Sequence, residues 1–144
     1  MTLLTAFDAD VLIYAAADGH PLGVPVASLF ADAGEEVVGI GSVLLLPEVL
    51  TKPMRDDPDS SEVTALIGLL GRLDLRPIDE ATARLAVAMA VSYGLRAADA
   101  AHLATAVAGG ADRFLTNNRR DFPATINEIA VVHPEDLADA RVPM

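Results

Sequence analysis

Residues 95–122 read LRAADAAHLATAVAGGADRFLTNNRRDF, and this stretch decides the fold. Its first half is rich in alanine and leucine and stops at two glycines, which predicts a helix over residues 97–108. The short apolar run that follows predicts a buried strand at residues 113–116. Polar side chains come immediately after that strand. A helix that leads through a glycine turn into a buried strand is typical of proteins in which helices and strands alternate.

The rest of the chain repeats this alternation. Apolar runs predict buried strands at residues 3–7, 37–40 and 129–132. Helix-compatible segments lie between the strands, at residues 11–17, 25–33, 43–54, 60–73 and 80–91. Alternating strands and helices favour a mostly parallel sheet with helices on both faces. We therefore predict one α/β domain over residues 1–144.

Local signals set the ends of two of these helices. Ser42 is the expected N-cap of the helix at 43–54, and Pro47 predicts that this helix begins late or kinks. Gly94 is the expected C-cap of the helix at 80–91.

Composition excludes several classes of protein. The 144 residues are 52% hydrophobic, enough for a buried core, and carry a net charge of −11. The absence of cysteine excludes disulfides, thiolate zinc sites and a cysteine nucleophile. No apolar run reaches the roughly 18–20 residues that a membrane span needs, and no basic segment precedes the first apolar run as in a secretory signal. We expect a soluble cytoplasmic protein with no membrane contact.

Carboxylates follow the predicted strands at corresponding places. Asp8 comes directly after the first strand, and Glu48 lies in the helix that follows the second. Asp99 occupies the first turn of the helix at 97–108, and Asp121 follows the next strand by one short turn. Ligands bind beyond the carboxyl ends of strands in such sheets, so these acids can converge on one edge. Each also has an ordinary structural interpretation as a helix cap, a first-turn acid, a solvated residue or a turn residue.

Electrostatics constrains the hypothesis that the acids converge. Two carboxylates about 4 Å apart repel by about 4 kcal/mol at an effective dielectric near 20. Several in one pocket need a cation, and the single lysine, Lys52, is not near most of them in sequence. The fitting partner is a hard divalent ion such as Mg²⁺ or Mn²⁺. Such ions activate water for in-line attack on phosphodiesters.

The ordered set FDADVLIYA, LPEVL and the stretch at 95–122 resembles PIN-domain ribonucleases, and more narrowly VapC-type toxins of bacterial toxin–antitoxin pairs. The similarity runs from about residue 4 to residue 132, which leaves a short C-terminal segment at 133–144. The resemblance implies the following site residues: Asp8, Glu48 and Asp99 as the core metal-binding acids, Asp121 as the fourth acid, and Thr116 and Asn118 as residues that position metal or water. Asn118 competes with Asp121 for the fourth place. Asp10 stands where the family more often has asparagine, and either caps the helix or adds an outer carboxylate.

The same resemblance implies a function. Its members are Mg²⁺- or Mn²⁺-dependent endoribonucleases that form homodimers and are inhibited by a cognate antitoxin peptide covering the site. We therefore expect RNA hydrolysis by metal-activated water, with a transfer, ribosomal or messenger RNA as the open alternatives for the substrate. The apolar excess of the helices within residues 43–73 predicts a groove for the antitoxin, and a homodimer interface could use the same excess.

Basic residues near the acids suggest a path for RNA. Arg96, Arg113, Arg119 and Arg120 lie close in sequence to the site acids, and Arg55 follows the helix of Glu48. Ordinary surface charge is the alternative for each of them singly. As a group we expect them to line the phosphate path, offsetting the negative net charge locally.

His102 lies one helical turn after Asp99, so a general base or a metal ligand is conceivable. Its place beside the apolar stripe of the helix at 97–108 favours a packed, hydrogen-bonded histidine instead.

Two other functions compete for the same sequence. The opening Asp8-x-Asp10 also resembles the start of haloacid-dehalogenase-type phosphatases, but those enzymes need a lysine after a Ser/Thr motif, and Lys52 precedes Thr116. A non-catalytic α/β protein that acts by binding a partner is the second alternative. Its acids would serve as helix caps or as an occasional cation site.

Overall fold

The computed structural model describes residues 3–140, in which five short parallel strands form one sheet in the order β3-β2-β1-β4-β5. The strands are β1 (Thr5–Phe7), β2 (Gly39–Ser42), β3 (Leu73–Arg76), β4 (Arg113–Leu115) and β5 (Ala130–Val132). The helices are α1 (Ala9–Ala16), α2 (Gly23–Asp32), α3 (Leu45–Asp56), α4 (Ser61–Leu70), α5 (Glu80–Tyr93), α6 (Ala97–Ala108) and α7 (Pro134–Ala140). The α/β fold with a parallel sheet is therefore confirmed.

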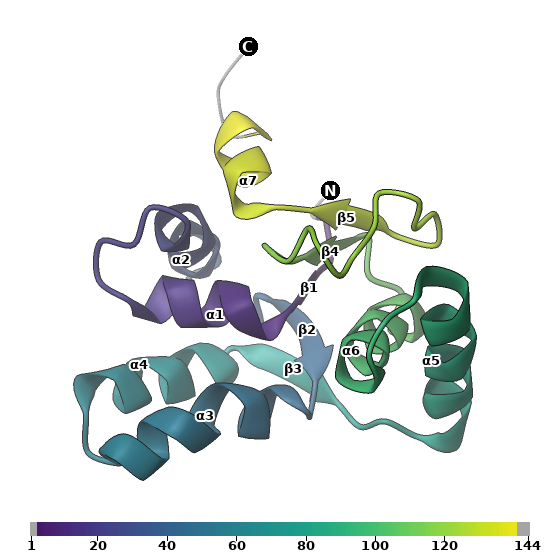
Figure 1. The fold of residues 1–144 in the computed structure, drawn as a ribbon. Coiled ribbons are helices and arrows are strands. Elements are labelled where there is room, and N and C mark those ends of the chain that lie inside the picture. The colour runs from purple at the N-terminus through teal and green to yellow at the C-terminus, as the bar shows by residue number, and fades with distance from the viewer. Residues whose placement is uncertain (1–2, 141–144) are drawn as a thin grey trace.

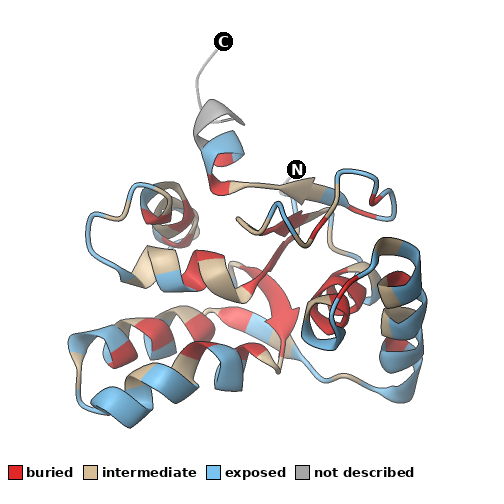
Figure 2. Cartoon of the chain, viewed as in Figure 1, coloured by how far each residue is buried: buried red, intermediate tan, exposed pale blue. Residues whose placement is uncertain are grey.

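Helices cover both faces of the sheet, with α1 to α4 on one side and α5 and α6 on the other (Figure 1). Neighbouring residues of a strand point to opposite layers, as the two-residue period of a strand requires. Ala6 and Phe114 pack against the α5–α6 side, whereas Phe7 and Leu115 pack against the α1–α4 side. Burial is most continuous along α6 and the central strands (Figure 2). This two-sided burial explains why the strands are apolar without alternation.

Most helix signals act as expected. Helix α6 has the predicted bounds, and Gly94 ends α5 in the left-handed conformation, with φ of 67°. Helix α3 begins late, at Leu45, which puts Pro47 in its first turn, where proline costs no hydrogen bond. Ser42 is not the N-cap of α3, because it belongs to β2; its Oγ accepts a hydrogen bond from the Leu44 N–H instead.

Two elements are absent from the sequence prediction. Strand β3 is one of them: the helix predicted over residues 60–73 reaches only its first residue, and no structure was predicted for residues 74–76. Helix α4 ends at Leu70 and Gly71 instead, and pairing with β2 turns the next residues into an edge strand. Helix α7 lies in the C-terminal segment, for which no structure was predicted, and residues 141–144 of that segment lie outside the described residues.

Within residues 3–140, no helix combines the length and the apolar character needed to cross a membrane.

Candidate functional site

The candidate site lies at the carboxyl ends of β1 and β4, which are neighbours in the sheet. The register pairs Phe7 with Leu115, so the next residues, Asp8 and Thr116, come out of the sheet side by side. The N–H of Asp8 donates to the Leu115 carbonyl at 3.0 Å, which extends this pairing by one residue. The parallel topology therefore places an acid and a hydroxyl at one point of the edge.

Asp8 is buried and fully engaged by hydrogen bonds. Only 6% of the residue is exposed. Its Oδ1 accepts from the Ala9 N–H at 2.8 Å, as the N-cap of α1, and its Oδ2 accepts from the Thr116 hydroxyl at 2.7 Å. Burial raises the pKa of Asp8, and the hydrogen bond from Thr116 opposes that rise. Asp8 is thus both a helix cap and a carboxylate held in a fixed orientation, so the structural and functional interpretations are compatible.

Asp10 ties the first turn of α1 to the loop after β4. Its Oδ2 accepts from the Asn117 N–H at 3.1 Å, while its Oδ1 is buried without a hydrogen-bond partner among the described residues. Burial, and then the charge of Asp8, raise the pKa of Asp10 to about 7. The cap of α1 is Asp8, so of the two roles left open for Asp10 the structure rules out the helix cap.

Asp99 completes the group from the other side of the sheet. It lies in the first turn of α6 and is half-buried. Burial raises the pKa of Asp99, and the charges of Asp8 and Asp121 raise it further. Glu48 contributes in the same direction. Acids from β1, α3, α6 and the loop after β4 therefore feel one another's charge, and we call Asp8, Asp10, Glu48, Asp99 and Asp121 the carboxylate edge.

Asn118 and Asp121, the two candidates for the fourth metal-site residue, are joined by two hydrogen bonds. The Asn118 amide donates to Asp121 Oδ2 at 2.9 Å, and Asn118 Oδ1 accepts from the Asp121 N–H at 3.1 Å. The Asn118 N–H in turn donates to the Thr116 hydroxyl at 3.0 Å. Asn118 therefore orients Asp121 and Thr116, which leaves Asp121 as the charged member of the pair.

His102 is buried beside Glu48. Its side chain is fully buried, and its Nε2 lies 3.1 Å from Glu48 Oε2. That contact has the length of a hydrogen bond but not its alignment, so neither ring nitrogen has a hydrogen-bond partner among residues 3–140. The packed position of His102 is confirmed, but the expected hydrogen bonds are not made. Sequence spacing relates His102 to Asp99, whereas its partner comes from another helix, which spacing does not reveal.

Comparison with protein families matches the PIN domain family over residues 6–126. The chain belongs to this PIN domain family. A chain of a toxin–antitoxin complex from Klebsiella pneumoniae is 25% identical, with a TM-score of 0.68, and covers 91% of this chain and 97% of its own length. No curated protein matches the sequence.

Two further solved structures have the PIN fold at lower identity. A chain of VapBC2 from Rickettsia felis bound to a promoter DNA fragment is 15% identical, with a TM-score of 0.69, and covers 91% of this chain and 98% of its own. A chain of DNA-bound VapBC from Salmonella typhimurium is 16% identical, with a TM-score of 0.72, and covers 92% and 99%. The resemblance to VapC-type PIN domains is thereby confirmed, and nothing in these matches supports the phosphatase alternative.

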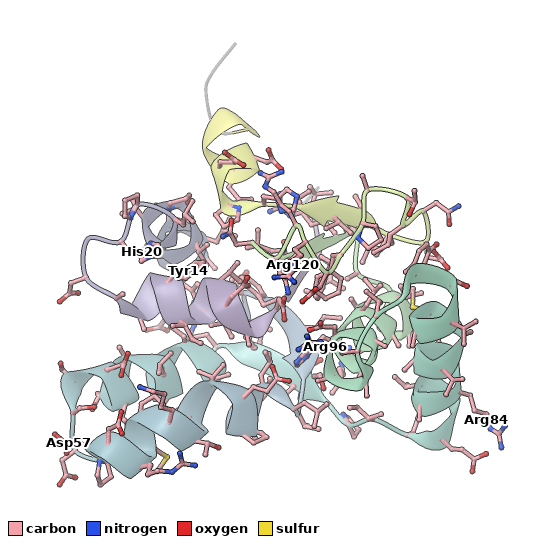
Figure 3. All side chains as sticks on the ribbon, in the orientation of Figure 1. Tyr14, His20, Asp57, Arg84, Arg96 and Arg120 are labelled. Atoms are coloured by element: carbon pink, nitrogen blue, oxygen red, sulfur yellow. The ribbon has the colours of Figure 1, made fainter. Side chains whose placement is uncertain are left out.

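The four arginines expected near the acids in the sequence lie at two different places in the structure. Arg96 is the residue before α6, and Arg120 follows β4; in Figure 3 both side chains lie between α1 and α6. Arg119, also exposed, forms an ion pair with Glu135 of α7. Arg113 begins β4, and its Nε donates to the Thr5 hydroxyl at 2.8 Å. Arg113 therefore lies at the opposite edge of the sheet from the acids, and the expectation that it lines the phosphate path is wrong.

The side-chain atoms of the carboxylate edge that could bind a metal are all oxygens, which a hard cation prefers. Among the described residues, the buried Asp10 Oδ1 has no hydrogen-bond partner. Among residues 3–140, however, no three acidic or histidine side chains stand close enough together to enclose a metal ion. Mg²⁺ is usually held by one or two carboxylates and several waters, so this spacing suits an open, water-rich site better than a closed cage.

Proposed function

We propose that this chain is the toxin of a toxin–antitoxin pair and acts as a Mg²⁺- or Mn²⁺-dependent endoribonuclease. Its PIN domain and its likeness to chains of toxin–antitoxin complexes support a nuclease of such a pair. The chemistry rests on one observation: burial raises the pKa of Asp8 and Asp99, and the charges of neighbouring acids raise both further. Acids that repel one another in this way are stabilised by a divalent cation.

The residues divide the work of hydrolysis between them. Asp8 and Asp99 are the proposed metal-binding carboxylates, and Glu48 and Asp121 complete the negative wall around them. A divalent ion, when bound, supplies an acidified water and charge stabilisation for in-line attack on a phosphodiester. The Thr116 hydroxyl holds Asp8 in one orientation, so less reorganisation is needed when the site is loaded.

The phosphate backbone of the RNA needs positive charge close to this negative edge. In Figure 3, Arg96 and Arg120 lie between α1, which Asp8 caps, and α6, which has Asp99 in its first turn. Arg119 lies in the same loop as Arg120. We assign these three arginines to the phosphate path because guanidinium groups bind phosphate oxygens in pairs. The net charge of −11 argues against a broad RNA-binding face, so the contact is local.

The direct test is cleavage of RNA by the purified protein. We expect Mg²⁺- or Mn²⁺-dependent cuts that excess EDTA abolishes and that Asp8→Asn abolishes without loss of the folded state by circular dichroism. Asp112→Asn is the matched control, because Asp112 lies at the other edge of the sheet. Full cleavage by Asp8→Asn or in EDTA contradicts the proposal. Sequencing of the cut ends identifies the RNA class.

The proposed antitoxin site is a groove beside Glu48. A hollow of about 240 Å³ between α1, α3 and α4 has apolar walls from Ile13, Val49 and Leu66, and Glu48 and Lys52 stand at its rim. A peptide in this groove would cover part of the carboxylate edge, which is how we propose that inhibition works. Ile13 is 38% exposed and lines the same hollow, so an Ile13→Asp substitution is expected to abolish inhibition by the antitoxin while leaving the core intact. Unchanged inhibition contradicts this placement.

A homodimer is the proposed assembly, and a separate apolar surface supports it. Val87 and Val91 of α5 are 64% and 80% exposed, and beside Val87 lies an apolar hollow of about 260 Å³ between α5 and α6. Exposed apolar surface of this kind marks an interface. Light scattering is expected to give a dimer for the wild type and a monomer for Val87→Asp. A monomeric wild type contradicts the assignment.

A non-catalytic partner-binding protein is the second candidate. It is favoured by the absence, within residues 3–140, of three side chains already gathered for a metal. Its acids would then serve as caps, as Asp8 does for α1. A protein that binds no Mn²⁺ and cuts no RNA, yet binds the antitoxin, would establish it.

A further inference from the structure

His102 is an anomaly in a helix made mostly of small apolar residues. Its exposed fraction is 2%, and both ring nitrogens lie where no solvent reaches them. A buried polar group without hydrogen bonds costs on the order of 1–3 kcal/mol, so native proteins rarely keep one without a reason. Thr105, one turn further on, shows the usual solution, because its hydroxyl donates to the Ala101 carbonyl of its own helix at 2.7 Å.

Among the described residues, His102 forms its ion-pair contact with Glu48. Nε2 and Glu48 Oε2 are 3.1 Å apart, and a small rotation of either side chain would align the N–H with the carboxylate. The charge of His102 also lowers the pKa of Asp8 and of Asp99, but within residues 3–140 it forms no ion pair with either acid. Its fully buried ring leaves it no open side for a substrate, so a general base is excluded in this arrangement.

Glu48 needs such a partner more than Asp8, Asp10 and Asp121 do. Asp8, Asp10 and Asp121 each accept a hydrogen bond from a backbone N–H or an amide. Glu48 lies on an exposed stretch of α3, and its side chain is 35% exposed. A free glutamate loses up to about 2 kcal/mol of rotamer entropy when it is fixed, so an unguided Glu48 would be a poor contributor to the site.

We propose that His102 is a positioning residue, which holds the Glu48 carboxylate over the site through an Nε2–H to Oε2 hydrogen bond. The inference deepens the proposed function and rests on it for the role of Glu48. The imidazole has its proton on Nε2, and Nδ1 faces the core. The buried imidazole of His102, in α6, thereby fixes the side chain of Glu48, in α3.

A matched pair of substitutions separates positioning from packing. Glutamine and methionine have the same length, but only the glutamine amide can donate near the place of Nε2. A packing role predicts that His102→Met is the better tolerated. Positioning predicts the reverse for Mn²⁺ affinity: a loss of about 10–100-fold in His102→Met and of no more than about 3-fold in His102→Gln, measured by calorimetry.

A double-mutant cycle tests whether the effect passes through Glu48. In the Glu48→Gln background, His102→Met is expected to change Mn²⁺ affinity by less than about 2-fold, because the Glu48 carboxylate that His102 positions is already absent. Thr105→Val is the control for disturbance of α6, with a changed melting temperature and unchanged Mn²⁺ affinity. Equal affinity in His102→Met and His102→Gln, or a full loss in the Glu48→Gln background, overturns the proposal.

A metal-free measurement keeps this test independent of the proposed function. Nitrogen-15 spectra of the metal-free wild type are expected to show the proton of His102 on Nε2, with a shift of that signal in Glu48→Gln. A proton on Nδ1, or no response to Glu48→Gln, overturns the inference even if the chain cleaves RNA. Failure of the wild type to bind Mn²⁺ instead contradicts the proposed function, and the spectra still decide whether His102 holds Glu48.

Discussion

At the amino-terminal edge of the sheet, charged residues are paired with ordinary structural partners. Asp112 Oδ2 accepts from the Leu4 N–H at 2.6 Å, and Arg113 donates to the Thr5 hydroxyl at 2.8 Å. At the carboxyl-terminal edge of the same two strands, burial raises the pKa of Asp8 and no basic side chain forms an ion pair with it among the described residues. Charged residues are thus paired with structural partners at one end of the strands, whereas at the other end a buried acid has no ion pair.

The difference lies in what surrounds each acid. Asp112 is exposed, so water and one backbone N–H are enough for it. Burial raises the pKa of Asp8, Asp10 and Asp99; the charge of Asp8 further raises the pKa of Asp10 and Asp99, and the charge of Asp99 raises that of Asp10. A folded protein tolerates such mutual repulsion where function requires it, and a cation relieves it. The charged residues at the amino-terminal ends of the strands stabilise the fold, and we assign those at the carboxyl-terminal ends to catalysis.

The largest effect is expected on RNA cleavage, when an acid is neutralised at one end of the strands or at the other. Asp99→Asn is expected to lower the rate of RNA cleavage by at least about 100-fold, since even outer residues of metal sites contribute about 10–100-fold. Asp112→Asn, the same change at the other edge, is expected to leave the rate within about 2-fold. Gel assays of both variants check this, and equal losses would remove the distinction between the edges.

The next effect concerns the hydroxyl that orients Asp8. Thr116→Val keeps the shape but removes the donor to Asp8 and the acceptor for the Asn118 N–H. We expect Mn²⁺ affinity to fall by about 10–100-fold. Thr105→Val is the matched control, since its hydroxyl serves only its own helix. A Thr116→Val protein with wild-type Mn²⁺ affinity would show that Asp8 needs no such support.

The metal-free protein should become less stable as the pH rises. The folded pKa of Asp10 is about 7, above its ordinary value of 3.8, so the folded state binds more protons than the unfolded state between these limits. The free energy of unfolding therefore falls as the pH rises from about 4 to about 8, and Asp8 and Asp99 act in the same direction. Asp10→Asn is expected to gain on the order of 1–2 kcal/mol at pH 8. Urea unfolding in EDTA measures both, and rising wild-type stability over this range would contradict the account.

The smallest effect is expected at the amino-terminal edge. Asp112→Ala removes the acceptor for the Leu4 N–H and should lower the free energy of unfolding by about 1 kcal/mol. Neither Mn²⁺ affinity nor its pH dependence should change. Urea unfolding and calorimetry of this one variant check both statements, and a loss of Mn²⁺ affinity would mean that the two edges are coupled.

Sequence patterns predicted the fold well where local signals agree with tertiary ones. Helix α6 is the best example, because alanine-rich spacing and the two glycines mark its ends without help from the rest of the chain. Strand β3 failed because four residues that follow an apolar helix have no signal of their own, and pairing with β2 decides their state. Propensity is a weak guide wherever such pairing dominates.

For the site, the order of elements predicted that Asp8 and Thr116 both follow strands of one parallel sheet. That these two strands are neighbours, so that the two residues lie side by side, comes from the structure. The place of Arg113 was predictable and was missed: the strand expected at residues 113–116 already begins at this residue, which puts its side chain at the amino-terminal end of the strand. One feature could not be predicted. The contact between His102 and Glu48 joins helices from opposite faces of the sheet, and only the folded arrangement of α3 and α6 brings it about.

The most direct test of the central claim is a calorimetric titration of the metal-free protein with Mn²⁺. The account predicts binding to the wild type, loss of that binding in Asp8→Asn and in Asp99→Asn, and full binding in Asp112→Asn. Absence of binding to the wild type, or equal binding in all four proteins, would contradict the assignment of the carboxyl-terminal edge as a cation site.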